Sequence, residues 1–175
     1  MDVYLMQHGE AVAGEVDPDR PLSGDGRRSV ETVAAHAAVC GVRLDRIVHS
    51  PKLRAEQSAG LLARALGCTE VGATAGLAPR DSVEVAAATL IDPADAGALA
   101  IVGHLPFLDR LASLLVTGES DAHVIAFCNG GLVRLVPAPG RVQPADADSA
   151  AVDARRPRFA VAWILTPELA AAPRS

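Results

Sequence analysis

The stretch VYLMQHG at residues 3–9 begins as an apolar run and ends in two polar residues and a glycine. A short apolar run without polar alternation is typical of a strand that is buried on both faces of a sheet. Two similar runs, at residues 46–49 and 98–102, also end close to a histidine, and a segment with helical spacing follows each of them. Strands that alternate with helices favour parallel pairing, because each crossover helix returns the chain to the same end of the sheet. The sequence therefore predicts an α/β fold.

The rest of the pattern predicts a three-layer α/β/α sandwich with a mostly parallel, mixed sheet and antiparallel closing strands. Helices are expected from the N-cap Ser23 to Gly41, from Lys52 to Leu66 after a cap at Ser50 and Pro51, from Ser82 to Leu90 and from Pro106 to Val116. Further strands are expected near Val71 and at 123–127, 132–136 and 159–165, with a hairpin-like turn at 129–131.

We predict a single domain over residues 1–175. Its least regular part is the segment 137–157, which is rich in Pro, Ala and Asp and has no periodicity. A structureless loop of that length is uncommon inside a compact domain. We interpret it as a mobile excursion between two edge strands, with a docking arm for a partner as the alternative.

The composition argues against several classes of protein. Half of the 175 residues are hydrophobic, which is enough to form a core, and a net charge of −5 without a basic run argues against nucleic-acid binding. Lys52 is the only lysine, and the three cysteines have neither metal-ligand nor redox spacing. No segment is long and apolar enough for a transmembrane helix, and residues 1–6 lack the pattern of a signal peptide. We therefore expect a cytoplasmic protein that does not bind membranes.

Three predicted strand-to-helix junctions carry residue types that suit a phosphate site. His8 follows the first strand, residues 50–54 open the helix after the second, and His104 ends the strand that begins at Ala98. In an open parallel sheet these junctions lie along the carboxyl edge, where ligands bind. Arg54 falls in the first turn of its helix, so its guanidinium would stand beside free backbone N–H groups and the positive end of the helix dipole. We expect these residues to converge on an anion.

Four motifs with this order resemble those of the histidine phosphatase superfamily. They are MQHGE at 6–10, RPLS at 20–23, SPKLRAEQ at 50–57 and VGHLP at 102–106. The compact length and the third motif are similar to the SixA-type phosphohistidine phosphatase branch. The resemblance implies a phosphoglycerate mutase-like fold without a large cap insertion. It also implies that the protein uses neither a metal nor an organic cofactor.

The resemblance assigns roles to individual residues. His8 matches the nucleophile that accepts the phosphoryl group, and Arg54 matches the arginine that binds phosphate oxygens. His104 matches the second histidine, which lies beside the phosphate and stabilises the group in transfer. Arg20 falls in a block near the pocket, and we expect it to bind phosphate.

The residue before the nucleophile departs from the family's Arg-His-Gly motif, because Gln7 stands in the place of the arginine. A glutamine amide can donate a hydrogen bond to a phosphate oxygen, but it brings no charge and no bidentate fork. Loss of one preorganised donor typically costs about 10²–10³ in rate. We therefore expect Gln7 to bind phosphate in a site that is slower but still catalytic.

The chemistry of the leaving group favours a phosphohistidine substrate. A phosphorylated imidazole leaves as neutral imidazole, whereas an alkoxide needs a general acid. The stretch 77–84 offers only Asp81 and Glu84 for that task, and we expect Asp81 to cap a helix instead. Asn129 is a candidate for supporting the site from its turn, with ordinary turn chemistry before two glycines as the alternative.

The predicted function is that of a phosphatase that works through a phosphohistidine on His8. Its expected substrate is a phosphohistidine-bearing protein in signalling, such as a histidine phosphotransfer domain or a phosphocarrier. One alternative is a phosphomonoesterase of small metabolites. The other is a non-catalytic module that binds phosphate or a phosphoprotein, which the glutamine at position 7 would permit.

Overall fold

The computed structural model describes residues 1–92, 96–138 and 159–172. The strands are β1 (Asp2–Gln7), β2 (Arg46–His49), β3 (Val71–Ala73), β4 (Ala98–Gly103), β5 (Leu132–Pro137) and β6 (Phe159–Leu165). The helices are α1 (Gly24–Val39), α2 (Leu53–Leu66), α3 (Val83–Leu90), α4 (Phe107–Thr117) and α6 (Pro167–Ala171). Strands and helices alternate from β1 to α4, as the sequence predicts.

The six strands of the described residues form one sheet in the order β3-β2-β4-β1-β5-β6. The strands β3, β2, β4 and β1 pair in parallel, whereas β5 pairs antiparallel with β1 and β6 antiparallel with β5. In the centre, β1 lies beside β4 with Met6 opposite Val102 and Gln7 opposite Gly103. The prediction of a mostly parallel sheet with antiparallel closing strands is confirmed.

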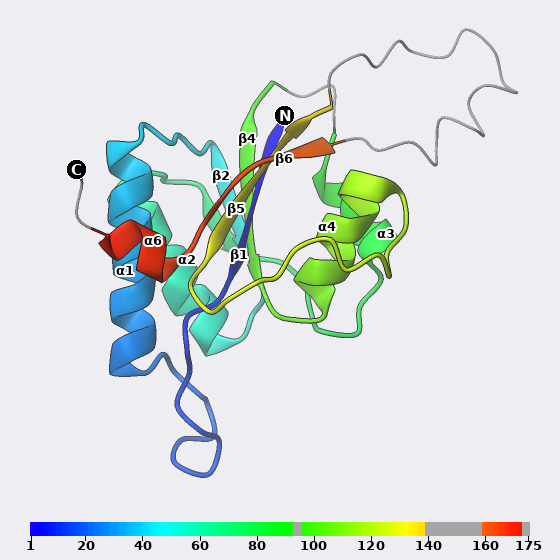
Figure 1. Ribbon diagram of the computed structural model, residues 1–175. Helices are drawn as coiled ribbons and strands as arrows, with labels where there is room; N and C mark the ends of the chain where they lie inside the picture. The colour runs from blue at the N-terminus through cyan, green and yellow to red at the C-terminus, as the bar shows by residue number, and fades with distance from the viewer. Residues whose placement is uncertain (93–95, 139–158, 173–175) are drawn as a thin grey trace, which may run out of the picture.

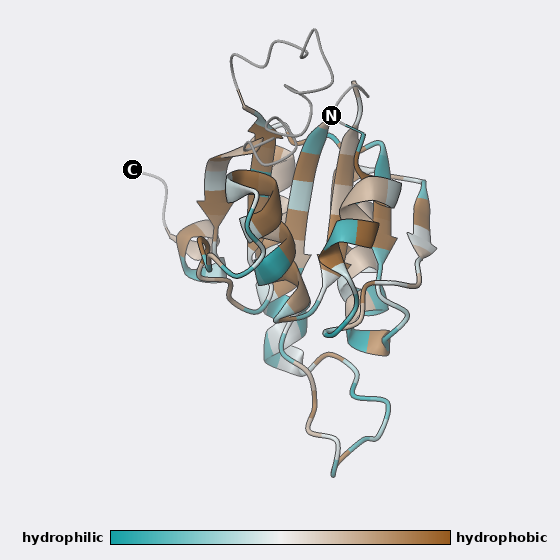
Figure 2. Cartoon of the chain, turned by 90° about the vertical axis from the view of Figure 1, so that its right-hand side faces the viewer, coloured by the Kyte–Doolittle hydropathy of each residue, from teal (hydrophilic) through white to brown (hydrophobic). Residues whose placement is uncertain are grey.

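Helices cover both faces of the sheet: α1, α2 and α6 lie on one face and α3 and α4 on the other (Figure 1). A hydrophobic core lies on each face of the sheet, and the side chains of β1 point alternately into one core and the other. Val3 and Leu5 pack with α3 and α4, and Tyr4 and Met6 pack with α1 and α2. All four are buried, and the central strands are largely hydrophobic (Figure 2). The unbroken apolar run of β1 therefore reflects burial on both sides, and the three-layer sandwich is confirmed.

Local sequence signals set the ends of α1. The Ser23 hydroxyl oxygen accepts a hydrogen bond from the Gly26 N–H at 3.0 Å, which makes Ser23 the predicted N-cap. Gly41 follows the helix with φ +76°, a conformation that glycine adopts without strain. The buried face consists of Gly26, Val30, Val33, Ala34 and Ala37.

Two local predictions are wrong. Segment 123–127 is not a strand: His123 has φ +50°, and the segment joins no described strand. Its apolar residues Ile125 and Phe127 instead pack on the core beneath α4. The second error concerns Ser50, because α2 begins only at Leu53 and its N-cap position is occupied by Lys52.

The end of the chain adds one element that the sequence analysis missed. Helix α6 starts after Thr166, whose hydroxyl accepts from the Leu169 N–H, and it packs against α1. The predicted loop at 137–157 lies outside the described residues, apart from Pro137, which ends β5, and residue 138. Among the described helices, none has the length and apolar character needed to cross a membrane.

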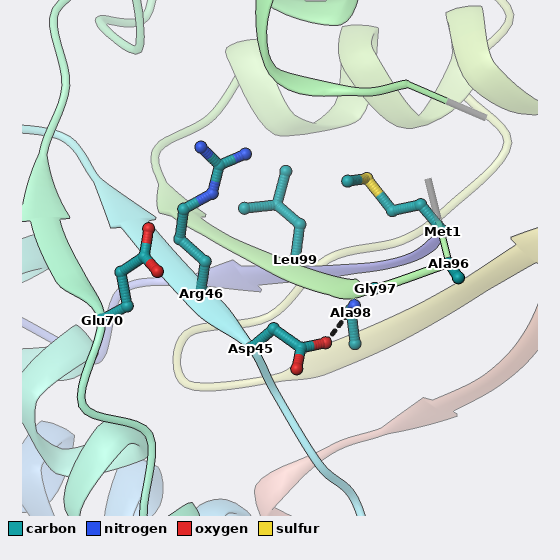
Figure 3. A pocket seen from close by; sticks show the side chains of 8 residues that line it. All are labelled: Met1, Asp45, Arg46, Glu70, Ala96, Gly97, Ala98 and Leu99. Carbon is teal, nitrogen blue, oxygen red and sulfur yellow. Dashed lines mark hydrogen bonds between the residues drawn. The ribbon is translucent and has the colours of Figure 1, made fainter. Parts of the chain in front are cut away.

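A cavity of about 530 Å³ opens at the amino edge of the sheet, where β1, β2 and β4 begin (Figure 3). Two of its polar side chains bind neighbouring backbone: Asp45 Oδ2 accepts from the Ala98 N–H at 2.7 Å, and Arg46 donates to the Leu90 carbonyl at 3.4 Å. This cavity lies at the opposite end of the strands from His8, so it is separate from the site described next.

Candidate active site

The carboxyl ends of β1, β2 and β4 bring the predicted site residues to one edge of the sheet. The backbone N–H of His8 donates to the Gly103 carbonyl at 3.1 Å. The backbone N–H of Ser50 donates to the Val102 carbonyl, also at 3.1 Å. The end of β1 and the approach to α2 are therefore both anchored on β4.

The ring of His8 is held in one tautomer. Its Nδ1 lies 2.6 Å from the Gly9 carbonyl oxygen, which can only accept, so Nδ1 carries the proton. Nε2 keeps its lone pair and accepts a hydrogen bond from Nε of Arg54 at 3.2 Å. Burial lowers the pKa of His8 against the opposing effect of the Gly9 carbonyl, and three cations lower it further: Arg54, Arg20 and Lys52. The ring is therefore neutral at pH 7, with a basic nitrogen beside a guanidinium.

The second histidine faces the first. The ring centroids of His8 and His104 lie 4.9 Å apart, with the ring planes at 60°. Burial lowers the pKa of His104 to about 3, together with repulsion from His8 when that ring is protonated and from the charges of Arg54 and Lys52. His104 is therefore neutral in this structure at pH 7. Charge on this ring requires an anion beside it, because negative charge favours the protonated imidazole.

Ser50 is a site residue that the sequence analysis assigned to helix capping. Its Oγ lies 2.8 Å from Nε2 of His104, and both residues are almost completely buried. Nδ1 of His104 has no hydrogen-bond partner among the described residues. The Ser50 hydroxyl therefore fixes the orientation of the His104 ring. The sequence does contain a signal for this role, because Ser50 directly follows β2 and therefore lies at the same edge of the sheet as the two histidines.

Close backbone contacts hold the loop after β1 against the helices. The Gly9 N–H donates to Ser58 Oγ at 3.1 Å, and the Ser58 hydroxyl donates to the Arg54 carbonyl at 2.7 Å. A Cβ atom on Gly9 would meet the Gly26 carbonyl oxygen at 2.6 Å. One on Gly26 would meet the Glu10 carbonyl oxygen at 2.1 Å. Glycine at both positions is what allows the loop and the first turn of α1 to approach so closely.

The side chain of Gln7 is turned toward Asn129. Its Nε2 donates to Asn129 Oδ1, and its Oε1 is buried without a hydrogen-bond partner in the described part of the chain. The Gly130 N–H donates to the carbonyls of Gln7 and His8 at 2.9 and 3.2 Å, which fixes this turn on the end of β1. Asn129 thus contacts the site through Gln7. The amide of Gln7, which was expected to donate to a phosphate, therefore already donates one hydrogen bond to Asn129.

Arg20 lies in the loop between β1 and α1, with φ +50°. Its Nε donates to the Val12 carbonyl at 3.3 Å. Burial and then the charge of Arg20 lower the pKa of Arg54, and the same charge lowers the pKa of His8. Arg20 is therefore close enough to contribute to the positive potential of the site.

The two carboxylates considered as general acids are engaged elsewhere. Asp81 Oδ2 accepts from the Ala78 N–H at 2.7 Å, in the turn before α3. Ser82, not Asp81, is the N-cap of α3, and its hydroxyl also donates to Glu84 Oε2 at 2.7 Å. Within the described ranges, no hydrogen bond joins either carboxylate to His8, Arg54 or His104.

This arrangement suits attack on an electrophilic anion. It offers a neutral imidazole whose basic Nε2 accepts a hydrogen bond from the Arg54 guanidinium, and a second histidine, His104, that is buried beside it. The three cations around the rings would stabilise the negative charge of a phosphoryl group. In the part of the chain that the structure describes, no group of three His, Cys, Asp or Glu side chains could hold a metal ion.

Comparisons with known proteins agree with this chemistry. The family model described as "Histidine phosphatase superfamily (branch 1)" matches residues 3–89. The chain is also 32% identical over 148 residues to an uncharacterized protein of Picosynechococcus sp., and this match covers 82% of the chain and 89% of the relative.

Solved structures share the fold. The protein histidine phosphatase SixA complexed with tungstate has a TM-score of 0.74 at 22% identity, covering 95% of this chain and 97% of that one. The putative phosphohistidine phosphatase SixA of Agrobacterium tumefaciens has a TM-score of 0.70 at 22% identity, with the same coverage. The fold also extends to a mycobacterial glucosyl-3-phosphoglycerate phosphatase, with a TM-score of 0.61 at 16% identity over 92% of this chain and 96% of that one.

Ser50→Ala is expected to release the His104 ring, because it removes the hydroxyl bonded to Nε2. Loss of a buried hydrogen bond that leaves its partner unsatisfied costs about 1–3 kcal/mol. We expect a fall of that size in the free energy of unfolding, measured by denaturant titration, and changed imidazole ¹⁵N chemical shifts of His104. Ser113→Ala, which alters another buried serine whose hydroxyl binds the Val124 N–H and neither His8 nor His104, should leave the His104 shifts unchanged. Unaltered His104 shifts in Ser50→Ala would refute the positioning role.

Proposed function

The chain belongs to the histidine phosphatase superfamily, and we propose that it is a phosphatase that forms a covalent phosphohistidine on His8. The finer part of the proposal is its substrate, a phosphorylated histidine on a signalling or phosphocarrier protein. The observation that carries the proposal is the state of His8: Nδ1 is protonated and bound to the Gly9 carbonyl, while Nε2 presents its lone pair beside Arg54.

The reaction proceeds in two steps. Nε2 of His8 attacks phosphorus, and the P–N bond forms as the bond to the leaving group breaks and its electrons depart with that group. Arg54 moves its hydrogen bond from Nε2 to the phosphoryl oxygens, where it neutralises charge in the transition state. Water then attacks phosphorus, the P–N electrons return to Nε2, and inorganic phosphate is released. Splitting the transfer in this way replaces one difficult step by two easier ones.

His104 supports the phosphoryl group from the other side. Its ring centroid lies 4.9 Å from that of His8, and Ser50 holds its Nε2. The free Nδ1 is a buried polar atom without a partner among the described residues. A bound phosphoryl group favours protonation of this ring, so His104 gains charge as the substrate binds.

The positions of the carboxylates support a P–N substrate. Asp81 and Glu84 bind the turn and the cap of α3, so neither is placed to protonate an alkoxide. A phosphorylated imidazole that carries a proton on its other nitrogen leaves as a neutral ring and needs no such acid. The name of the tungstate-bound structural relative, a protein histidine phosphatase, agrees with a histidine phosphotransfer domain or a phosphocarrier as the substrate.

Gln7 motivates a second candidate, a module that binds phosphate without catalysis. The amide of Gln7 is bound to Asn129 and provides no charge where the family has an arginine. Such a module would keep phosphate affinity through Arg54 and its neighbours but form no covalent intermediate. Turnover of small phosphate esters is the third possibility, since one structural relative is named a glucosyl-3-phosphoglycerate phosphatase.

A trapped phosphoenzyme separates the catalyst from the binding module. After incubation with a ³²P-labelled phosphohistidine protein and rapid denaturation, we expect label on the protein that resists alkali and is lost in acid. His8→Ala should abolish the label and turnover, because the attacking nitrogen is gone. His36→Ala, which removes a histidine in the last turn of α1, is the matched control and should keep both. Label that persists in His8→Ala would exclude the proposed nucleophile.

The substrate class is tested by comparing kcat/KM values. A phosphorylated histidine protein is expected to exceed phosphoserine and sugar phosphates by at least about tenfold, because Asp81 and Glu84, the two candidate general acids, are engaged at α3 and are not placed to protonate an alkoxide leaving group. All three are measured on the same preparation by release of inorganic phosphate. A clear preference for an alkyl phosphate would favour the small-metabolite phosphatase instead.

Gln7→Arg is expected to raise kcat/KM by about tenfold or more, because it adds a fixed cation where negative charge develops. A gain that persists at high salt indicates direct contact with the phosphoryl group, since screening weakens only the longer-range attraction. Gln7→Met, which keeps the length of the side chain without a donor, should give no gain. An unchanged or lower rate in Gln7→Arg would mean that the contact with Asn129 has shaped the pocket around glutamine.

A further inference from the structure

Lys52 is the only lysine in a chain that has 16 lysine and arginine residues in total. Wherever else this chain carries a permanent basic side chain, it uses arginine, so the lysine is an exception that the proposed mechanism leaves unexplained. Its position is also specific. It lies two residues after Ser50, which binds His104, and two residues before Arg54, which binds His8.

The local structure gives Lys52 no role in stability. It occupies the N-cap position of α2, where Ser, Thr, Asp and Asn are preferred, and its side chain makes no capping hydrogen bond. A cation at this end of a helix is also unfavourable, because the helix dipole is positive there. The side chain is exposed. Helix α2 would therefore be more stable with Ser, Thr, Asp or Asn at this position.

The charges of the site favour the binding of an anion. Arg20, Lys52 and Arg54 gather at one edge of a protein whose net charge is −5. None of the three forms an ion pair with a carboxylate among the described residues, although other cations do, such as Arg134 with Asp2. The charge of Lys52 acts on both rings, since it lowers the pKa values of His8 and His104. This agrees with the place of Lys52 at the start of α2, between Ser50 and Arg54, which bind the two rings.

We propose that the ε-ammonium group of Lys52 binds the phosphoryl group of the substrate, as the second cation of the site beside Arg54. The inference rests on the proposed function, because it takes the anion at this edge to be a phosphoryl group. A lysine ammonium is a compact charge with three donors on a flexible stem, so it can reach an oxygen that a fixed guanidinium does not. From the junction between β2 and α2, Lys52 supplies the positive charge that Gln7 does not provide at the end of β1.

The single lysine gives a direct test. Reductive methylation of the full chain with ¹³C-formaldehyde labels Lys52 and the terminal amine and leaves both positively charged. On titration with inorganic phosphate, we expect the dimethyl-lysine resonance to shift and to saturate with the same dissociation constant as the imidazole signal of His8. A resonance that stays unchanged while the His8 signal titrates would overturn the proposal.

Variants measure the strength of the contact. Lys52→Met keeps the apolar stem without the charge and is expected to weaken phosphate binding about tenfold, the usual order for a hydrogen bond to a charged group. Lys52→Arg should bind within about threefold of the unmodified protein. Arg43→Met removes one exposed cation before β2, at the opposite edge of the sheet, and should bind normally. If Lys52→Met binds as tightly as Arg43→Met, the contact does not exist.

These measurements need no turnover, so the two proposals fail separately. A phosphoenzyme on His8 together with normal phosphate binding by Lys52→Met would reject the role of Lys52 and leave the proposed function standing. Weakened binding by Lys52→Met in a protein that forms no phosphoenzyme would support the role of Lys52 and reject catalysis in favour of the binding module.

Discussion

The register between β1 and β4 is the constraint on which the candidate site depends. Because Gln7 lies opposite Gly103 in a parallel pair, the residues that follow them, His8 and His104, leave the sheet side by side. Their ring centroids are 4.9 Å apart as a direct result. A shift of one residue would exchange the two faces of β1, moving Val3 and Leu5 out of one core and Tyr4 and Met6 out of the other. The hydrophobic core therefore fixes the distance between the two histidines.

Desolvation and positive charge act together on these rings. Both effects disfavour protonation, so His8 and His104 are neutral at pH 7 although histidine ordinarily titrates near this range. For His8 this is the form that attacks in the proposed mechanism. The repulsion among the clustered cations is confined to this edge of the sheet, and an anion that binds there relieves it. An acidic protein can thus present a small basic site without a basic surface.

The glycine contacts and the serine hydrogen bonds keep this site rigid. Gly9 and Gly26 allow the loop after β1 to rest on the first turn of α1, and Ser58 ties the same loop to α2 beside Arg54. Ser50 holds His104 in the same way from the end of β2. Each histidine is therefore positioned by an element other than its own strand. Preorganisation of this kind lets the charges stabilise a transition state without having to rearrange first.

The sequence by itself determined the sheet, its layers and the edge at which the site lies, because apolar runs and helix caps are local signals. It also supplied His8, Arg54 and His104 as the residues to be found there. Only the tertiary structure decided what surrounds them: that Ser50 binds His104 instead of capping α2, that Asn129 holds Gln7, and that residues 123–127 pack on the core without joining the sheet. Serine, asparagine and short apolar segments serve several local structures about equally well. Their roles are set by partners far away in the chain, which no local pattern records.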